Sequence, residues 1–226
     1  MELAARVTAL CVVGAILALV LKKASPEQAL LLVLCAAAAG LALLLWGPWW
    51  LIAVGVAIAV GVVAYSTGPY PLSHHGLGEV AVLFFFGIIP VTMTYYIQAG
   101  CVTWPVFLGS LSIGLMGANV LIVNNYRDLE ADAAVGKRTL AVILGGRTVR
   151  VFYLLNGVVG VALMTGSWLT LGVAWLVVPV LFLVGMTAIY VALGRRHGRA
   201  LTPLLGMTAL EMLVYSILFL MAAALS

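Results

Sequence analysis

The two aspartates of this 226-residue chain, Asp128 and Asp132, stand four positions apart. On a helix, side chains at i and i+4 share one face, with Cβ atoms about 6 Å apart. Two carboxylates placed in this way can bind a hard divalent cation and leave coordination positions for water and phosphate oxygens. Acidic residues in a chain that is 65% hydrophobic and 8% charged indicate a functional site. The spacing therefore predicts a Mg²⁺ site, with a solvated acidic helix end as the plainer alternative.

Amide side chains fall on the same predicted helical face as the aspartates. Asn124 precedes Asp128 by four positions, and Asn125 reaches this face at three and seven positions. Amide oxygens are good Mg²⁺ ligands, so Asn125 is predicted to be a third metal ligand beside the two carboxylates. We predict that Asn124, Asn125 and Arg127 also bind the substrate.

Two basic residues follow the aspartates beside a flexible glycine, in the stretch Gly136-Lys137-Arg138. Two cations at a turn can bind a diphosphate, whose charge would otherwise repel the carboxylates. We therefore predict Lys137 and Arg138 as catalytic residues together with Asp128 and Asp132. The alternative, which is the weaker one for these two residues, is that they only anchor the loop at the membrane surface; for Arg147 and Arg150, anchoring and a functional role are equally favoured.

A second polar and aromatic stretch covers residues 65–79. We predict that Tyr65, Tyr70 and Glu79 contact the substrate. For Glu79 the alternative is a structural role at a helix N-terminus, where a carboxylate is stabilising, and interfacial tyrosines are commonly headgroup anchors. His74 and His75 are adjacent, so they face different ways and form a poor metal pair.

Long uncharged segments must position these groups. Each segment of about 20 apolar residues can cross a hydrocarbon core of roughly 30 Å, which predicts an all-α, polytopic membrane bundle and makes nucleic acid an implausible partner. Cys11, Cys35 and Cys101 have no metal-binding spacing and are interpreted as small core residues. About eight spans are expected, over residues 3–21, 28–46, 49–66, 79–98, 104–123, 149–166, 171–193 and 203–224.

The loops between these spans predict the orientation of the chain. Counted alternately, one side carries every lysine and arginine except Arg6, and the positive-inside rule makes that side cytoplasmic. The segment 3–21 has no small-residue cleavage site, so it is interpreted as a span instead of a signal peptide. We thus expect one membrane domain over residues 1–226, an integral protein of a bacterial inner membrane with the aspartate loop in the cytoplasm.

The motif Asn124-Asn125-x-Arg127-Asp128-x-x-x-Asp132-x-x-x-Gly136-Lys137-Arg138-Thr139 resembles the second aspartate-rich motif of the UbiA-type intramembrane prenyltransferases. It is most similar to the branch that prenylates 1,4-dihydroxy-2-naphthoate in menaquinone synthesis. The stretches 68–72, 76–79 and 84–87 fit the same branch in the same order. The resemblance runs from about Pro26 to the C-terminus.

The resemblance implies nine helices around a central cavity, with two aspartate-rich motifs facing each other. The first motif, Asn-Asp-x-x-x-Asp, is absent from this sequence, and Leu21-Lys22-Lys23 stands where its carboxylates belong. The domain is therefore expected to be N-terminally incomplete relative to the family. On that basis we expect low or no activity without a complementing segment.

The reaction implied by the resemblance is Mg²⁺-assisted departure of diphosphate from a polyprenyl diphosphate. The prenyl group would alkylate an aromatic acceptor, 1,4-dihydroxy-2-naphthoate in this branch, with decarboxylation to demethylmenaquinone. Tyr65 and Tyr70 would stabilise the allylic cation through their π faces.

Several alternatives remain beside this interpretation. One is an inactive paralogue or fragment that acts as a membrane or lipid-binding partner, and another is an enzyme with a different aromatic acceptor, such as 4-hydroxybenzoate or haem. A transporter is disfavoured because the central spans lack paired broken helices. A CDP-alcohol phosphotransferase would need a longer aspartate–glycine pattern than this sequence has.

Overall fold

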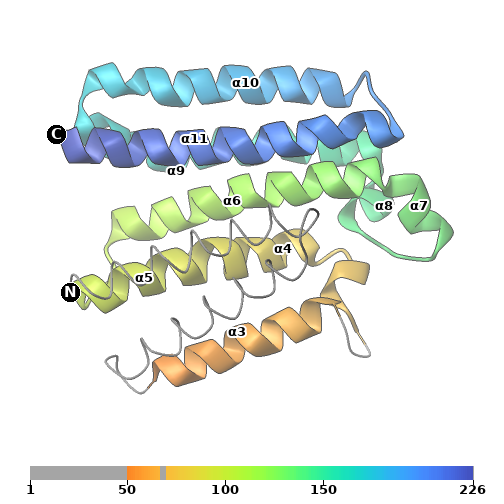
Figure 1. Ribbon diagram of the computed structural model, residues 1–226, viewed down its shortest axis with the longest axis horizontal. Helices are drawn as coiled ribbons and strands as arrows, with labels where there is room; N and C mark the ends of the chain where they lie inside the picture. The colour runs from red at the N-terminus through yellow and green to blue at the C-terminus, as the bar shows by residue number, and fades with distance from the viewer. Residues whose placement is uncertain (1–49, 67–69, 226) are drawn as a thin grey trace, which may run out of the picture. The chain divides into compact units, whose positions relative to one another are not determined.

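Apolar helices dominate the part of the chain that the computed structural model describes, residues 50–66 and 70–225 (Figure 1). This confirms the predicted all-α class. The predicted spans from 49–66 onwards each correspond to a helix, while those over 3–21 and 28–46 lie outside the described residues. The elements in chain order are α3 (Leu51–Ser66), η1 (Leu72–His74), α4 (Gly78–Val82), η2 (Leu83–Ile88), α5 (Ile89–Ala99), α6 (Trp104–Arg127), α7 (Leu129–Ala134), α8 (Leu140–Leu144), α9 (Gly146–Leu171), η3 (Val173–Leu176), α10 (Val177–Leu193), η4 (Gly198–Leu201) and α11 (Thr202–Leu225).

Five helical segments of the described chain are long and apolar enough to cross a membrane. Their length follows from the hydrocarbon thickness, since about 20 residues of helix span roughly 30 Å. Together with the family membership reported below, they make the chain an integral membrane protein. The segments are Gly78–Ala99, Trp104–Arg127, Gly146–Leu171, Val173–Leu193 and Gly198–Leu225.

The described residues fall into two compact units. Residues 50–60 and 93–102 belong to the first, in which the rings of Trp50 and Tyr96 meet edge to face with centroids 5.1 Å apart. Residues 61–66, 70–92 and 103–225 belong to the second, which contains all the helices from α6 onwards and the polar loops. The interpretation of residues 1–226 as a single domain stays a prediction.

The segment Gly78–Ala99 is one continuous helix with a wider turn in its middle. This π-helical turn spans Leu83–Ile88 and lies just before Pro90. Proline has no N–H to donate to the carbonyl four residues earlier, and its ring clashes with that carbonyl. A local π turn relieves the clash and keeps the helix continuous. The sequence pattern predicted an unbroken span here, and the structure has this span with one widened turn.

Within the second unit, α6 is packed on several sides. Its Gly114 meets Gly87 so closely that a Cβ on Gly87 would collide with the Gly114 backbone, and a Cβ on Gly114 would lie 2.8 Å from the carbonyl oxygen of Leu83. Small residues allow this approach of two helix backbones, as is common in membrane bundles. The contact packs the middle of α6 closely against the helix that begins beside Glu79.

On another side, α6 is joined to α9 by buried polar contacts. Ser112 Oγ donates to the carbonyl of Gly160 at 2.8 Å, and Asn119 Nδ2 donates to the carbonyl of Tyr153 at 2.9 Å. From α9, Trp168 Nε1 donates to the hydroxyl of Tyr215 in α11 at 2.7 Å. With no water in a bilayer core, such polar groups must find protein partners, so these contacts fix the helices' register.

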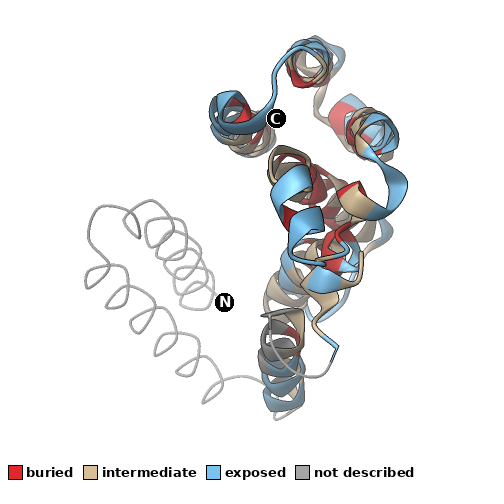
Figure 2. Cartoon of the chain, turned by 90° about the vertical axis from the view of Figure 1, so that its right-hand side faces the viewer, coloured by how far each residue is buried: buried red, intermediate tan, exposed pale blue. Residues whose placement is uncertain are grey.

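The outer faces of α9, α10 and α11 carry exposed apolar side chains (Figure 2). Leu181, Val184, Leu210 and Leu220 are each about three-fifths exposed or more. An apolar surface of this extent is typical of a protein whose solvent is lipid.

Candidate functional site

The aspartates lie at the end of α6 and on the short helix α7. α6 ends at Arg127, and Asp128 leaves the helical region with φ −97° and ψ 9°. Helical hydrogen bonding nevertheless continues, since the N–H of Asp128 donates to Asn124 O at 3.1 Å and the N–H of Asp132 donates to Asp128 O at 2.8 Å. The predicted four-residue stepping along one helical direction is thus present in the backbone.

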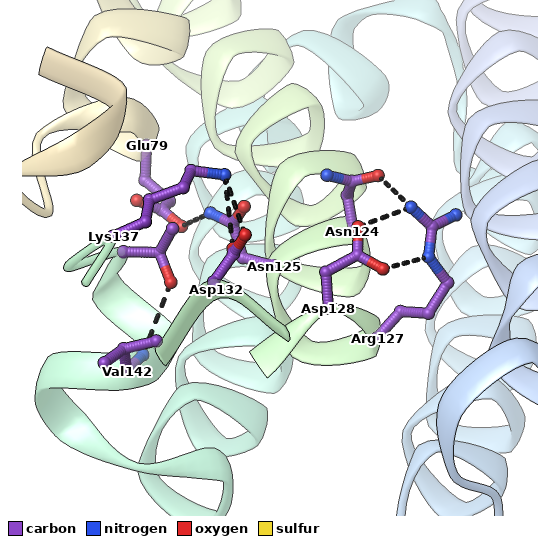
Figure 3. Close-up of polar contacts among 9 residues, drawn as sticks. Glu79, Asn124, Asn125, Arg127, Asp128, Asp132, Lys137 and Val142 are labelled. Atoms are coloured by element: carbon purple, nitrogen blue, oxygen red, sulfur yellow. Dashed lines mark hydrogen bonds and ion pairs between the residues drawn. The ribbon is translucent and has the colours of Figure 1, made fainter. Parts of the chain in front are cut away.

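The side chains of the two aspartates nevertheless have different partners (Figure 3). Arg127 holds Asp128 through two hydrogen bonds, Nε to Oδ1 at 2.7 Å and Nη2 to Oδ2 at 2.6 Å, and it also donates to Asn124 Oδ1 at 2.9 Å. This bidentate contact holds the pKa of the Asp128 carboxyl below its ordinary value, although partial burial opposes the shift. Asp128 is therefore ionised at neutral pH.

Asp132 is paired with a different cation. Lys137 Nζ donates to both of its carboxylate oxygens at 3.2 Å, and the backbone N–H of Lys137 donates to the carbonyl of Asp132 at 2.9 Å. Asp132 is buried, whereas the Asp128 side chain is 37% exposed. The turn at Gly136, with φ 74°, brings the lysine back onto the aspartate.

The third polar contact joins α4 to α6. Asn125 Nδ2 donates to Glu79 Oε1 at 2.9 Å, and both residues are buried, with exposed fractions of 4% and 7%. Glu79 lies in the first turn of α4, where a carboxylate is also favoured by the helix dipole.

The two polar loops are fastened together by their backbones. The N–H of Arg138 donates to the carbonyl of His74 at 3.0 Å, within an isolated bridge between His75 and Arg138. The His75 ring stacks on Tyr70 with centroids 3.5 Å apart, and its Nδ1 lies 2.8 Å from the carbonyl oxygen of Pro71. The loop after α3 and the loop after α7 thus form one rim.

Beneath this rim lies a cavity of about 260 Å³. It is lined by polar groups from both loops and by the ends of α3, α4 and α6. The lining residues are Tyr65, Ser73, His74, Gly76, Gly78, Glu79, Leu121, Asn124, Asn125, Lys137, Thr139 and Leu140.

The predicted site residues divide between this cavity and its surroundings. Five of them line it: Tyr65, Glu79, Asn124, Asn125 and Lys137. The others are not in its lining. Asp132 pairs with Lys137, Asp128 pairs with Arg127, Arg138 is an exposed residue of the rim, and Tyr70 stacks on His75.

Sequence reasoning did not identify Thr139, which is 1% exposed and lines the cavity. Its Oγ1 accepts the N–H of Val142 at 3.4 Å and so caps α8. A threonine just before an apolar helical run is a recognisable N-cap signal, which could have identified it. His74 was noted only as half of a poor metal pair; the structure places it on the cavity wall.

The donor set suits a hard divalent cation in its chemistry. Asn125 lines the cavity and Asp132 pairs with the lining residue Lys137, and Mg²⁺ prefers carboxylate and amide oxygens completed by water and phosphate. In the described residues no group of three or more His, Cys, Asp or Glu side chains is close enough to hold a metal alone. The residues therefore fit Mg²⁺ as a cation shared with a phosphate-bearing substrate.

The chain matches a known protein family and several named relatives. Residues 15–207 match the UbiA prenyltransferase family. The chain is 38% identical over 188 residues to the 1,4-dihydroxy-2-naphthoate octaprenyltransferase of Mycobacterium tuberculosis, with 80% of this chain and 62% of the relative covered. The enzyme of the same name from Mycobacterium leprae is 39% identical over 184 residues, covering 79% and 60%.

A shorter match reaches a related activity. The 2-carboxy-1,4-naphthoquinone phytyltransferase of Synechocystis sp. is 34% identical over 92 residues, which cover 41% of this chain and 30% of the relative. No solved structure matches the chain significantly. The chain spans about three fifths of the length of the mycobacterial relatives. From the family match and these identities, the chain belongs to the UbiA prenyltransferase family.

Proposed function

We propose that this protein transfers a polyprenyl group from a polyprenyl diphosphate to an aromatic acceptor in the membrane. The proposed acceptor is 1,4-dihydroxy-2-naphthoate, and its prenylation with loss of CO2 and diphosphate gives the quinol form of demethylmenaquinone. Relatives named for this acceptor, matched over about four fifths of the chain, support the choice. The observation that carries the proposal is the polar cavity at one end of an apolar helical bundle.

The basic residues have the roles of binding and neutralising the diphosphate. Lys137 lines the cavity, and its Nζ is held 3.2 Å from both carboxylate oxygens of Asp132. This pairing orients the ammonium group, and the lysine side chain stays partly exposed. As the bond between the allylic carbon and the diphosphate oxygen breaks, negative charge grows on the leaving group, and Lys137 and Arg138 stabilise that charge. Asn124 donates through its amide to the same phosphate oxygens.

Mg²⁺ is the proposed cofactor: Asp128, Asp132 and Asn125 would hold it, and it would supply Lewis-acid activation of the leaving diphosphate. Arg127, which contacts both carboxylate oxygens of Asp128, is the residue predicted to bind the substrate. The apolar helices hold the isoprenoid tail and exclude the water that would quench an allylic cation.

We also propose the orientation of the site. Arg138, Arg147, Arg195, Arg196 and Arg199 are exposed in or beside the connections on either side of α8 and between α10 and α11. Arg150 Nη2 donates to the carbonyl of Tyr190 at 3.3 Å, which ties these two connections to the same end of the bundle. A cluster of cations at one end supports placing the cavity on the cytoplasmic side of a bacterial inner membrane.

The test is prenyl transfer by membranes that contain the full chain, with 1,4-dihydroxy-2-naphthoate, a polyprenyl diphosphate and Mg²⁺. We expect a low level of product, which an added segment carrying Asn-Asp-x-x-x-Asp raises, and which is lost on adding EDTA and in Asp128→Ala and Asp132→Ala, with each variant still inserted in the membrane. The matched control is Glu130→Gln, which removes an exposed carboxylate of α7. Wild-type rates in both aspartate variants would refute the assignment of the site.

A second candidate, an inactive membrane or lipid-binding partner, is favoured by one observation. Both carboxylate oxygens of Asp128 are engaged by Arg127, and Asp128 does not line the cavity. If the chain yields no product with any acceptor, including 4-hydroxybenzoate, and an added segment carrying Asn-Asp-x-x-x-Asp does not restore it, this candidate replaces the enzyme.

A further inference from the structure

Glu79 presents a carboxylate oxygen that the fold does not use. Its Oε1 accepts the hydrogen bond from Asn125 at 2.9 Å. Its Oε2 is buried, and no other residue in the described part of the chain donates to it. Glu79 is only 7% exposed and is one of the residues that line the cavity, which places the unpaired oxygen beside the cavity and away from the protein surface.

A buried Glu79 Oε2 without a hydrogen-bond donor costs free energy. Burying a carboxylate without its full set of hydrogen bonds is unfavourable, and buried polar groups in folded proteins are almost always satisfied. Lys137, the one lysine or arginine in the cavity lining, donates to Asp132 instead of Glu79. The missing donor is therefore expected to come with a ligand.

The charge of Glu79 restricts what that ligand can be. A diphosphate has only acceptor oxygens and would be repelled by the carboxylate, whereas a neutral hydroxyl group can donate to it. The hydroxyl of Tyr65 also lies near Glu79. It is next to Gly78, the residue before Glu79, where a Cβ would be 3.7 Å from Tyr65 Oη. Gly78 thus leaves room for the phenol of Tyr65 beside the first turn of α4.

We propose that Glu79 Oε2, together with the Tyr65 hydroxyl, is the subsite that binds a ring hydroxyl of the aromatic acceptor. This inference rests on the proposed prenyl transfer. It adds that the part of the cavity formed by Glu79 and Tyr65 recognises the aromatic acceptor. The acceptor donates its O–H to Glu79, while the diphosphate stays with Lys137 and Asn124. Glu79 is in this role a specificity-determining residue that selects acceptors with a free hydroxyl.

The size of the cavity agrees with this division. Pockets that enclose drug-sized ligands hold about 300–1,000 Å³, and this one holds about 260 Å³. Such a volume suits a ring or a phosphate group, and the isoprenoid tail must then lie along the apolar helices.

The test measures binding, so that it does not depend on turnover. The full chain, purified in nanodiscs under argon, is titrated with 1,4-dihydroxy-2-naphthoate and with its 4-methoxy analogue, following tryptophan fluorescence. Separate titrations with a non-hydrolysable polyprenyl diphosphate analogue and with Mg²⁺ complete the set. The proteins compared are the wild type, Glu79→Gln, which keeps the size and the contact with Asn125, and the charge-matched control Glu130→Gln.

We expect the wild type to bind the free hydroxyl about 10- to 150-fold more tightly than the methyl ether, as for a hydrogen bond to a charged group. Glu79→Gln should lose this discrimination while keeping its affinity for the diphosphate analogue, and Glu130→Gln should match the wild type. Equal binding of the two acceptors by the wild type would overturn the inference, even if Glu79→Gln failed to insert. A Glu79→Gln variant that lost affinity for Mg²⁺ or for the diphosphate alone would also overturn it.

The outcome for the proposed function is separate. A wild type that binds neither the acceptor nor the diphosphate analogue contradicts prenyl transfer itself. A wild type that binds both without regard to the hydroxyl leaves prenyl transfer standing and removes only the role of Glu79.

Discussion

Arg127 is the residue on which the charge of the predicted metal site depends. It contacts both oxygens of Asp128 and the amide oxygen of Asn124, so a single guanidinium links a predicted metal ligand to a predicted substrate-binding residue. The contact is partly exposed, with 37% of the Asp128 side chain accessible. Solvent screening therefore makes its contribution to stability small, and its main effect is on the protonation of Asp128.

This effect can be measured directly. Arg127 lowers the pKa of Asp128, so the stability that comes from the charged pair is present above the ordinary aspartate pKa and is lost as the pH falls through the lowered value. Arg127→Gln should raise the pKa of Asp128 towards its ordinary value of 3.8. Carbon-13 NMR of aspartate-labelled protein can follow this, since the chain has only two aspartates and Asp132→Asn leaves one signal.

The matched control for this titration is Arg147→Gln, which removes the same charge from an exposed position at the start of α9. The pKa of Asp128 should not move in that variant. An unchanged titration in Arg127→Gln would show that the guanidinium does not set the charge of Asp128.

At the scale of the elements, η2 and α6 cross so closely that their backbones leave no room for a side chain at Gly87 or Gly114. Gly114→Ala would bring a methyl group within 2.8 Å of the Leu83 carbonyl oxygen. Overpacking of this kind costs about 1–3 kcal/mol. We expect a loss of that order in the free energy of unfolding, measured by chemical denaturation in detergent micelles.

Gly109→Ala in the same helix is the control for this substitution. Its Cβ would meet only the sulphur of Met164, at 3.4 Å, and methionine is flexible enough to move aside. If the two variants were equally stable, the close crossing would not constrain the bundle.

The elements show which features of the fold a sequence can predict. The all-helical class and the spans from 49–66 onwards follow from apolar length alone, because the bilayer fixes how long a segment must be. The backbone stepping of Asn124, Asp128 and Asp132 was also predicted from their spacing. The π turn was missed, since an apolar pattern does not distinguish a regular helix from one widened ahead of Pro90.

The partners of the site side chains could not be predicted in the same way. Asn125 donates to Glu79 from a position 46 residues away, and the N–H of Arg138 meets the carbonyl of His74 across a comparable separation. Such pairs depend on how helices pack, which no local motif encodes. The division of Asp128 and Asp132 between two different cations likewise depends on the turn after α7.

For the molecule as a whole, the orientation in the membrane is the property to test. The interpretation of Cys101 as a core residue is wrong, because Cys101 is exposed between α5 and α6. Val135 is exposed after α7. By the loop count, the first position faces away from the cytoplasm and the second faces the cytoplasm. With Cys11 and Cys35 replaced by serine, intact spheroplasts should label Cys101 with an impermeant maleimide.

The complementary variant replaces Cys101 by serine and carries Val135→Cys. It should react with the same reagent only after the membrane is permeabilised. The reverse labelling pattern would place the cavity on the opposite side of the membrane, and it would exclude a substrate that is supplied from the cytoplasm.

The position of the cavity along the chain has a consequence for biosynthesis. In the described part of the chain, all the lining residues come from positions 65–140. The ribosome therefore completes this wall before it has made α9, and the later helices join a site whose groups are already specified. Their contacts, such as Asn119 with the Tyr153 carbonyl, secure the far side of α6. Relatives could thus differ in the sequence of these last helices, and so in stability and lipid preference, while they keep the same groups in the cavity.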